Sequence, residues 1–124
     1  DYINVRFLGK KIGNEKFNLL SQSDLFILPS YTEGMPISIL EAMKFGNAII
    51  STNVGCIRNL IKDHAVVINP GEINNLRNEI AKFIYNPAYL TQYKEKSNHY
   101  SKNNDKKQIY FENIIKIYSQ KTLV

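Results

Sequence analysis

The amino-acid sequence predicts an α/β fold in which helices flank a parallel sheet. Four short runs of apolar, β-branched or aromatic residues recur along the chain, and a helical pattern follows each of them. These runs are residues 5–8, 25–28, 48–51 and 65–68. Turns that contain Gly, Pro or Asn follow the ends of the runs. Because an intervening helix joins parallel strands, this order predicts successive β-α units that share one sheet.

Capping signals predict where the helices begin and end. Proline suits the first turn of a helix and glycine suits the position after the last turn, so Pro36 and Gly46 mark the two ends of one helix. Asn14 is the predicted N-cap of an earlier helix over 15–21, in which Phe17 and Leu20 face the sheet. The other predicted helices are 57–61, 73–85, 88–98 and 106–121. The helix over 73–85 has an apolar stripe at Ile73, Leu76, Ile80 and Phe83 or Ile84.

Length, hydropathy and cysteine usage narrow the class of protein. The 124 residues are enough for one hydrophobic core, which we divide into a β-α part (1–87) and a helical tail (88–124). The sequence contains no apolar run near ~18 residues, so neither a membrane span nor a signal peptide is expected. Cys56 is the only cysteine, which excludes an internal disulfide and predicts a cytoplasmic location.

The net charge of +5 is concentrated in the tail. Seven lysines and three acidic residues between positions 94 and 121 account for four of the five net positive charges. A solvated helix face is the simplest explanation, and contact with an anionic membrane surface is the alternative. A nucleic-acid partner is disfavoured, because the chain has only three arginines and no aromatic residues interleaved with them.

Two glutamates frame the start of the helix that begins at Pro36. Glu33 lies in the preceding loop, and Glu41 lies roughly 7 Å into the helix, on the turn above Ile37 and Ser38. The free N–H groups of the first turn and the positive end of the helix dipole point into the same space. A phosphate at the helix start and a diol beside Glu41 would together make a nucleotide site. The simpler explanation for Glu33 is that its carboxylate only caps the helix.

The predicted topology places this stretch at a ligand-binding edge. In an open parallel sheet, the loops that follow the strands share one edge, and ligands bind outside the carboxyl ends of the strands. Glu33 and the Pro36 helix are expected at that edge for this reason alone.

The same residues resemble a known family. Residues 24–30 (DLFILPS), 33–36 (EGMP), 41–50 (EAMKFGNAII) and 52–55 (TNVG) look like the C-terminal half of a family 4 glycosyltransferase of the GT-B fold. Glu33 and Glu41 match the Glu-x7-Glu signature of that family. The resemblance extends over about residues 5–70 and implies a Rossmann-like sheet in the C-terminal, nucleotide-sugar-binding domain.

The resemblance also implies roles for individual residues. Glu41 would accept hydrogen bonds from the ribose hydroxyls, and Glu33 would lie by the transferred sugar as the catalytic residue. The loop of Gly9, Lys10 and Lys11 would lie by the base. Such enzymes transfer sugar with retention and need no metal cofactor, which agrees with the lack of an Asp-x-Asp pair here. The remaining residues of the implied nucleotide-sugar site are Gly34, Met35 and Pro36, with the amides of Ile37 and Ser38 on the diphosphate.

The chain departs from the family pattern at several points. Pro36 stands where glycine is common and removes one amide, and Gly55-Cys56 replaces a Gly-Gly pair. The cationic residues that neutralise the diphosphate, and the acceptor domain, are expected upstream of this chain. We therefore expect a piece of a larger enzyme that is inactive alone. The whole enzyme would transfer a sugar to a glycan or a lipid-linked acceptor, in the cytoplasm or at the inner face of the membrane.

Two alternatives remain open at this point. A sugar-nucleotide epimerase of the GT-B fold would share the sheet and the nucleotide site. A non-catalytic module that binds a nucleotide or a membrane surface would use the basic tail. Neither His64 nor His99 has a carboxylate or cysteine at ligand spacing, so both are expected to be isolated surface residues. Cys56 is expected to be a small residue in a tight turn.

Overall fold

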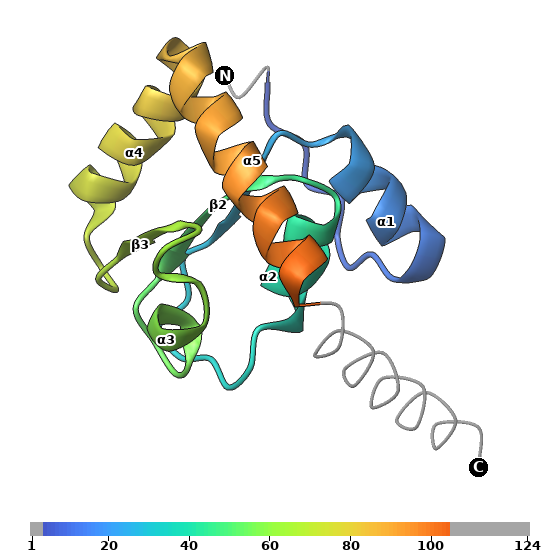
Figure 1. Cartoon of the computed structure of the whole chain (residues 1–124), viewed down its shortest axis with the longest axis horizontal. Helices are drawn as coiled ribbons and strands as arrows, with labels where there is room; N and C mark the ends of the chain where they lie inside the picture. Colours follow the sequence, from blue (N-terminus) through green and yellow to red (C-terminus); the bar gives the residue numbers. More distant parts are fainter. Residues whose placement is uncertain (1–3, 105–124) are drawn as a thin grey trace.

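The computed structural model describes residues 4–104 and contains a three-stranded parallel sheet with helices on both faces (Figure 1). The predicted α/β class with a parallel sheet is confirmed. In chain order the elements are α1 (Gly13–Gln22), β1 (Leu25–Leu28), α2 (Ile37–Lys44), β2 (Ala48–Thr52), α3 (Ile57–Ile61), β3 (Val66–Ile68), α4 (Ile73–Tyr85) and α5 (Pro87–Asn103).

The strands follow one another across the sheet in the order β1-β2-β3. Leu28 pairs with Ser51, and Thr52 pairs with Ile68, so the three strands end at the same edge. Every residue of the central strand β2 is buried. The three corresponding strand predictions are confirmed to within one residue at each end.

The fourth predicted strand, residues 5–8, is wrong. Phe7 is 93% exposed and Val5 is 51% exposed, and this segment pairs with no strand in the part of the chain that the structure describes. A strand is stabilised by its hydrogen-bonded neighbour and by burial of one face, and residues 5–8 have neither here. The β-branched and aromatic composition of the run favours a strand only where a neighbouring strand and a buried face are present.

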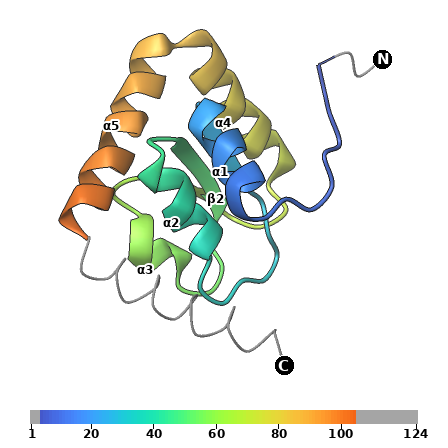
Figure 2. The same cartoon turned by 90° about the vertical axis from the view of Figure 1, so that its right-hand side faces the viewer.

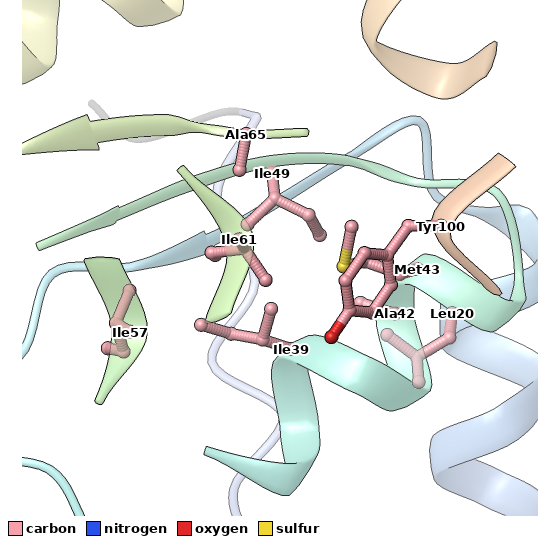
Figure 3. Close-up of a cluster of buried hydrophobic side chains, with 9 residues drawn as sticks. All are labelled: Leu20, Ile39, Ala42, Met43, Ile49, Ile57, Ile61, Ala65 and Tyr100. Carbon is pink, nitrogen blue, oxygen red and sulfur yellow. The ribbon is translucent and has the colours of Figure 1, made fainter. Parts of the chain in front are cut away.

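Alternation of side chains along β2 divides the core between the two faces of the sheet. On one face, Ile49 packs with residues of α1, α2 and α3 and with Tyr100, which reaches in from α5 (Figure 3). On the other face, Ala48 and Ile50 pack with Ile68 and with Phe83 of α4. Both faces are therefore covered, as a parallel sheet requires.

The predicted ends of the helix framed by Pro36 and Gly46 are confirmed. Pro36 is the residue before α2, and Gly46 follows its C-cap with a φ of +74°. The Gly46 amide donates to the Met43 carbonyl (3.0 Å), and the Asn47 amide donates to the Ala42 carbonyl (3.1 Å). These two bonds form a Schellman motif, which requires the left-handed backbone that glycine adopts without strain.

Details of the predicted helices differ from the structure in three places. Helix α1 begins at Gly13, so Asn14 lies inside the helix and does not cap it. Leu20 is buried as predicted, but Phe17 is 37% exposed and packs on Phe45 at the end of α2 (5.7 Å between ring centroids). Helix α4 has the predicted bounds, but its apolar stripe is narrower than predicted. Ile73 and Ile84 are exposed. The contacts with the core come from Leu76, Ile80 and Phe83.

Helix α5 crosses the molecule along the amino ends of the strands (Figure 1). Tyr89 and Tyr93 at its start pack with α4 on one face of the sheet, whereas Tyr100 belongs to the core on the other face. Between them, the Lys94 ammonium donates to Asp24, just before β1 (2.7 Å). The helix predicted over 88–98 is confirmed and is longer. The helix predicted over 106–121 lies outside the described residues.

Candidate functional site

The loops that follow the three strands lie together at the carboxyl edge of the sheet. The Asn53 amide, just after β2, donates to the Ile68 carbonyl at the end of β3 (2.7 Å). Tyr31, in the loop after β1, lies beside Gly71 in the loop after β3, since a Cβ on Gly71 would be 3.7 Å from the Tyr31 hydroxyl. In Figure 2 the start of α2 lies at this same end of the molecule. The predicted placement of the Glu33 loop at this edge is thus observed.

Hydrogen bonds fix the loop that carries Glu33. The Ser30 hydroxyl donates to Glu33 Oε1 (2.6 Å), and the Thr52 hydroxyl donates to the Ser30 carbonyl (2.5 Å). Glu33 is half-buried, and within residues 4–104 its carboxylate makes no hydrogen bond to a backbone amide of α2. The alternative in which Glu33 only caps α2 is therefore wrong for this structure. The carboxylate is instead held against its own loop, with β2 as the support.

The loop after β2 packs closely against the backbone of Glu33 and Gly34. Gly55 has a φ of +56°, and a Cβ at this position would clash with the Glu33 carbonyl oxygen. The neighbouring Cys56 thiol donates to the Gly34 carbonyl (3.3 Å). Sequence reasoning treated Gly55 and Cys56 as parts of a turn and missed this contact. Only a glycine permits so close an approach of two backbones with a positive φ.

The start of α2 includes an unpaired backbone donor. Pro36 has φ −81° and ψ 85°, and across it the Ile37 amide donates to the Met35 carbonyl (3.0 Å). The Ser38 amide has no hydrogen-bond partner within residues 4–104. Two amides were predicted to hold a diphosphate. The Ser38 amide is unpaired, whereas the Ile37 amide already donates to the loop carbonyl of Met35. Gly34 and Met35 are exposed in the same loop.

Glu41 lies one turn further along α2 and is paired with a lysine. The Lys16 ammonium of α1 donates to Glu41 Oε1 at 2.8 Å, and the Glu41 side chain is only 18% exposed. Sequence reasoning did not single out Lys16. The available signal was its helical spacing of four residues from Leu20, which puts both side chains on the face of α1 that meets α2.

The loop predicted to lie by the base, residues 9–11, makes no direct contact with Glu33 or Glu41 through a hydrogen bond or an ion pair in the described residues. Gly9 and Lys10 are exposed, and Lys11 pairs with Glu15 in the first turn of α1 (3.6 Å). No hydrogen bond or ion pair connects residues 9–11 with 33–41 in the region that is described. Figure 2 shows this loop leading into α1, which lies beside α2.

The histidines are not isolated, contrary to the sequence prediction. His64 and His99 stack with ring centroids 6.4 Å apart, and burial lowers the pKa of His64 although Asp63 opposes this shift. They border a hollow of about 300 Å³ at the amino edge of the sheet, away from Glu33 and Glu41. Its lining residues are Asp63, His64, Gln92, Glu95, Lys96 and His99.

Two features are absent from residues 4–104. No group of three or more His, Cys, Asp or Glu residues converges there in a way that could hold a metal ion. None of the described helices is both long enough and apolar enough to cross a membrane.

Known proteins similar to the chain are glycosyltransferases. One relative, 43% identical over 54 residues, is the N,N'-diacetylbacillosaminyl-diphospho-undecaprenol alpha-1,3-N-acetylgalactosaminyltransferase of Campylobacter jejuni; the match covers 43% of this chain and 14% of that protein. A second is the putative teichuronic acid biosynthesis glycosyltransferase TuaC of Bacillus subtilis, 37% identical over 52% of this chain and 17% of the relative. A third is the UDP-Gal:alpha-D-GlcNAc-diphosphoundecaprenol alpha-1,3-galactosyltransferase of Escherichia coli, 37% identical over 56% of this chain and 18% of the relative. The matched part is thus less than a fifth of each relative.

The fold and the glycosyltransferase class agree with the sequence expectation. The solved structure of sucrose-phosphate synthase from Thermosynechococcus elongatus matches 78% of this chain and 27% of that one, with a TM-score of 0.63 at 20% identity. This similarity concerns the fold alone, and it agrees with the expected GT-B class. The family described as Glycosyl transferases group 1 matches residues 3–107. Because that match covers most of the sequence, the chain belongs to the group 1 glycosyl transferases.

Proposed function

We propose that this chain is the donor-binding part of a retaining, family 4 glycosyltransferase. The complete enzyme transfers a sugar from a nucleotide-diphosphate sugar to a glycan or a lipid-linked acceptor. Family membership and the acceptors named for the relatives, two of them diphospho-undecaprenol compounds, support this proposal. The cytoplasmic face of the membrane is the proposed site of action, where such an acceptor would be reached by peripheral contact.

The observation that carries the proposal is the arrangement of Glu33, Ser38 and Glu41 around the start of α2. Two partly buried carboxylates flank an unpaired helix-start amide at the carboxyl edge of a parallel sheet. A diphosphate fits the amide and the positive end of the helix dipole. Glu41 then accepts from the ribose hydroxyls, because ionised carboxylates form strong hydrogen bonds with O–H donors.

Glu33 is the residue that we propose acts on the donor sugar. Its carboxylate is fixed by Ser30 while Gly34 beside it leaves the backbone open to a close approach. Charge that develops on the leaving diphosphate is stabilised by the Ser38 amide, the dipole of α2 and cationic side chains from the rest of the enzyme. No metal cofactor is required in this scheme.

The test uses the complete enzyme and two isosteric variants. Glu33→Gln is expected to lower kcat by at least about 100-fold with little change in melting temperature, because it removes a charge beside the reacting sugar. Glu41→Gln is expected to raise the Kd for the donor and to affect kcat less. Transfer from uridine and guanosine diphosphate sugars to undecaprenyl-diphosphate-linked N-acetylglucosamine is measured by product mass.

A matched control is Glu95→Gln, which changes an exposed carboxylate at the opposite edge of the sheet and should leave transfer unchanged. A fully active, stable Glu33→Gln enzyme would refute the catalytic role of Glu33. Conversion of the nucleotide sugar without transfer to any acceptor would favour an epimerase. Donor binding without any chemical change would favour a non-catalytic module.

A further inference from the structure

The Lys16–Glu41 ion pair links two helices that serve different parts of the proposed donor site. Lys16 lies in α1, just after the loop proposed to contact the base, and Glu41 lies in α2, whose start is proposed to hold the diphosphate. The Lys16 Nζ and Glu41 Oε1 atoms are 2.8 Å apart although the residues are 25 positions apart in sequence. The pair therefore fixes the separation of these two helices beside the site.

Among the ion pairs of the described residues, this one joins a largely buried carboxylate to a lysine of another helix. The Lys16 and Glu41 side chains are 34% and 18% exposed, whereas Asp24, bound by Lys94, is 67% exposed. The remaining pairs are local in sequence: Lys11, just before α1, pairs with Glu15 in its first turn, and the buried Glu79 pairs with Lys82 within α4. A carboxylate as buried as Glu41 needs a compensating charge, because removing it from water is costly.

The Lys16 side chain is also held by an aromatic ring. Its ammonium lies 5.2 Å from the centroid of Phe17, and that ring packs on Phe45 at the end of α2. Glu41 Oε2 has no hydrogen-bond partner within residues 4–104. Lys16 thus engages one oxygen of the carboxylate and leaves acceptor capacity on the other.

We propose that Lys16 is a positioning residue for donor binding, which acts by holding the Glu41 carboxylate in an orientation in which its second oxygen meets the ribose hydroxyls. This inference rests on the proposed role of Glu41. Lys16 supplies a cation from within this chain at the ribose end of the donor. It adds to the cations expected from the rest of the enzyme and does not replace them.

The experiment measures the Kd and the kcat for the donor in the complete enzyme. Lys16→Met keeps the length of the side chain and removes its charge, and it is expected to weaken donor binding about tenfold while kcat changes less than about twofold. Lys16→Arg is expected to restore most of the affinity, because it restores the charge-assisted bond. The control is Lys94→Met, which breaks another ion pair of similar length between residues far apart in sequence and should leave the Kd unchanged.

A double-mutant cycle separates positioning from a general structural effect. If Lys16 acts through Glu41, Lys16→Met adds no further loss of affinity to Glu41→Gln. Multiplicative effects of the two changes would overturn the inference, as would a Lys16→Met enzyme with normal affinity while Glu41→Gln binds weakly. Normal affinity of Glu41→Gln alone would instead overturn the proposed role of Glu41, so the two failures are distinguishable.

Discussion

The two edges of the sheet carry polar clusters that are built in different ways. At the carboxyl edge, Glu33 and Ser30 are supported by Thr52 and Gly55 from the neighbouring strand and its loop. At the amino edge, two stacked histidines border a hollow of about 300 Å³ beneath α5. The amino edge has the more obvious collection of titratable groups, yet the proposed donor site of Glu33, Ser38 and Glu41 lies at the other edge. The proposed site therefore rests on topological position and not on the density of ionisable residues.

The largest expected effect breaks the packing at the carboxyl edge. Gly55→Ala forces a Cβ against the Glu33 carbonyl at a φ of +56° and is expected to cost about 2–4 kcal/mol of stability, or to displace the Glu33 loop with loss of transfer. Thermal unfolding and transfer assays of the complete enzyme measure both outcomes. Gly13→Ala is the matched control, because Gly13 has a φ of +55° but nothing within 4 Å of the added Cβ. Equal effects of the two changes would contradict the proposed backbone contact.

A smaller effect is expected when one hydrogen bond at the same edge is removed. Thr52→Val keeps the shape of the side chain but leaves the Ser30 carbonyl without the Thr52 hydroxyl, at an expected cost of about 1–2 kcal/mol. The Kd for the donor is expected to rise because Ser30 positions Glu33. Thr91→Val, on the exposed side of α5, serves as the control. Unchanged melting temperature and affinity would indicate that β2 does not support the loop.

The smallest expected effect concerns the amino edge and its pH dependence. Burial lowers the pKa of His64, and Lys96 and His99 lower it further against the opposing charge of Asp63. The folded state thus binds this proton less readily than the unfolded state, so stability falls as the pH drops through the ordinary histidine range near about 6.5. His64→Gln should reduce the dependence of the melting temperature on pH in this range. The corresponding change in the free energy of unfolding is expected to be well under about 1 kcal/mol, since His64 is only half-buried. A loss of transfer in this variant at pH 8 would contradict the separation of the two edges.

Local patterns in the sequence determined much of the fold. The runs at 25–28, 48–51 and 65–68 and the helical signals between them specify parallel β-α units, because side-chain period and turn residues act over a few positions. The ends of α2 follow from Pro36 and Gly46, and the bounds of α3 and α4 were predicted to the residue. The position of Glu33 at the carboxyl edge followed from topology.

Tertiary structure decided which side chains meet at the site and which runs become strands. Glu41 pairs with Lys16 across 25 positions, and Gly55 packs on Glu33 across a similar separation. His64 and His99, expected to be isolated, stack because α5 folds back across the sheet. Residues 5–8 have the composition of a strand but no neighbour among the described residues. Such contacts depend on the three-dimensional packing of elements that are far apart in sequence, and no local period or propensity encodes them.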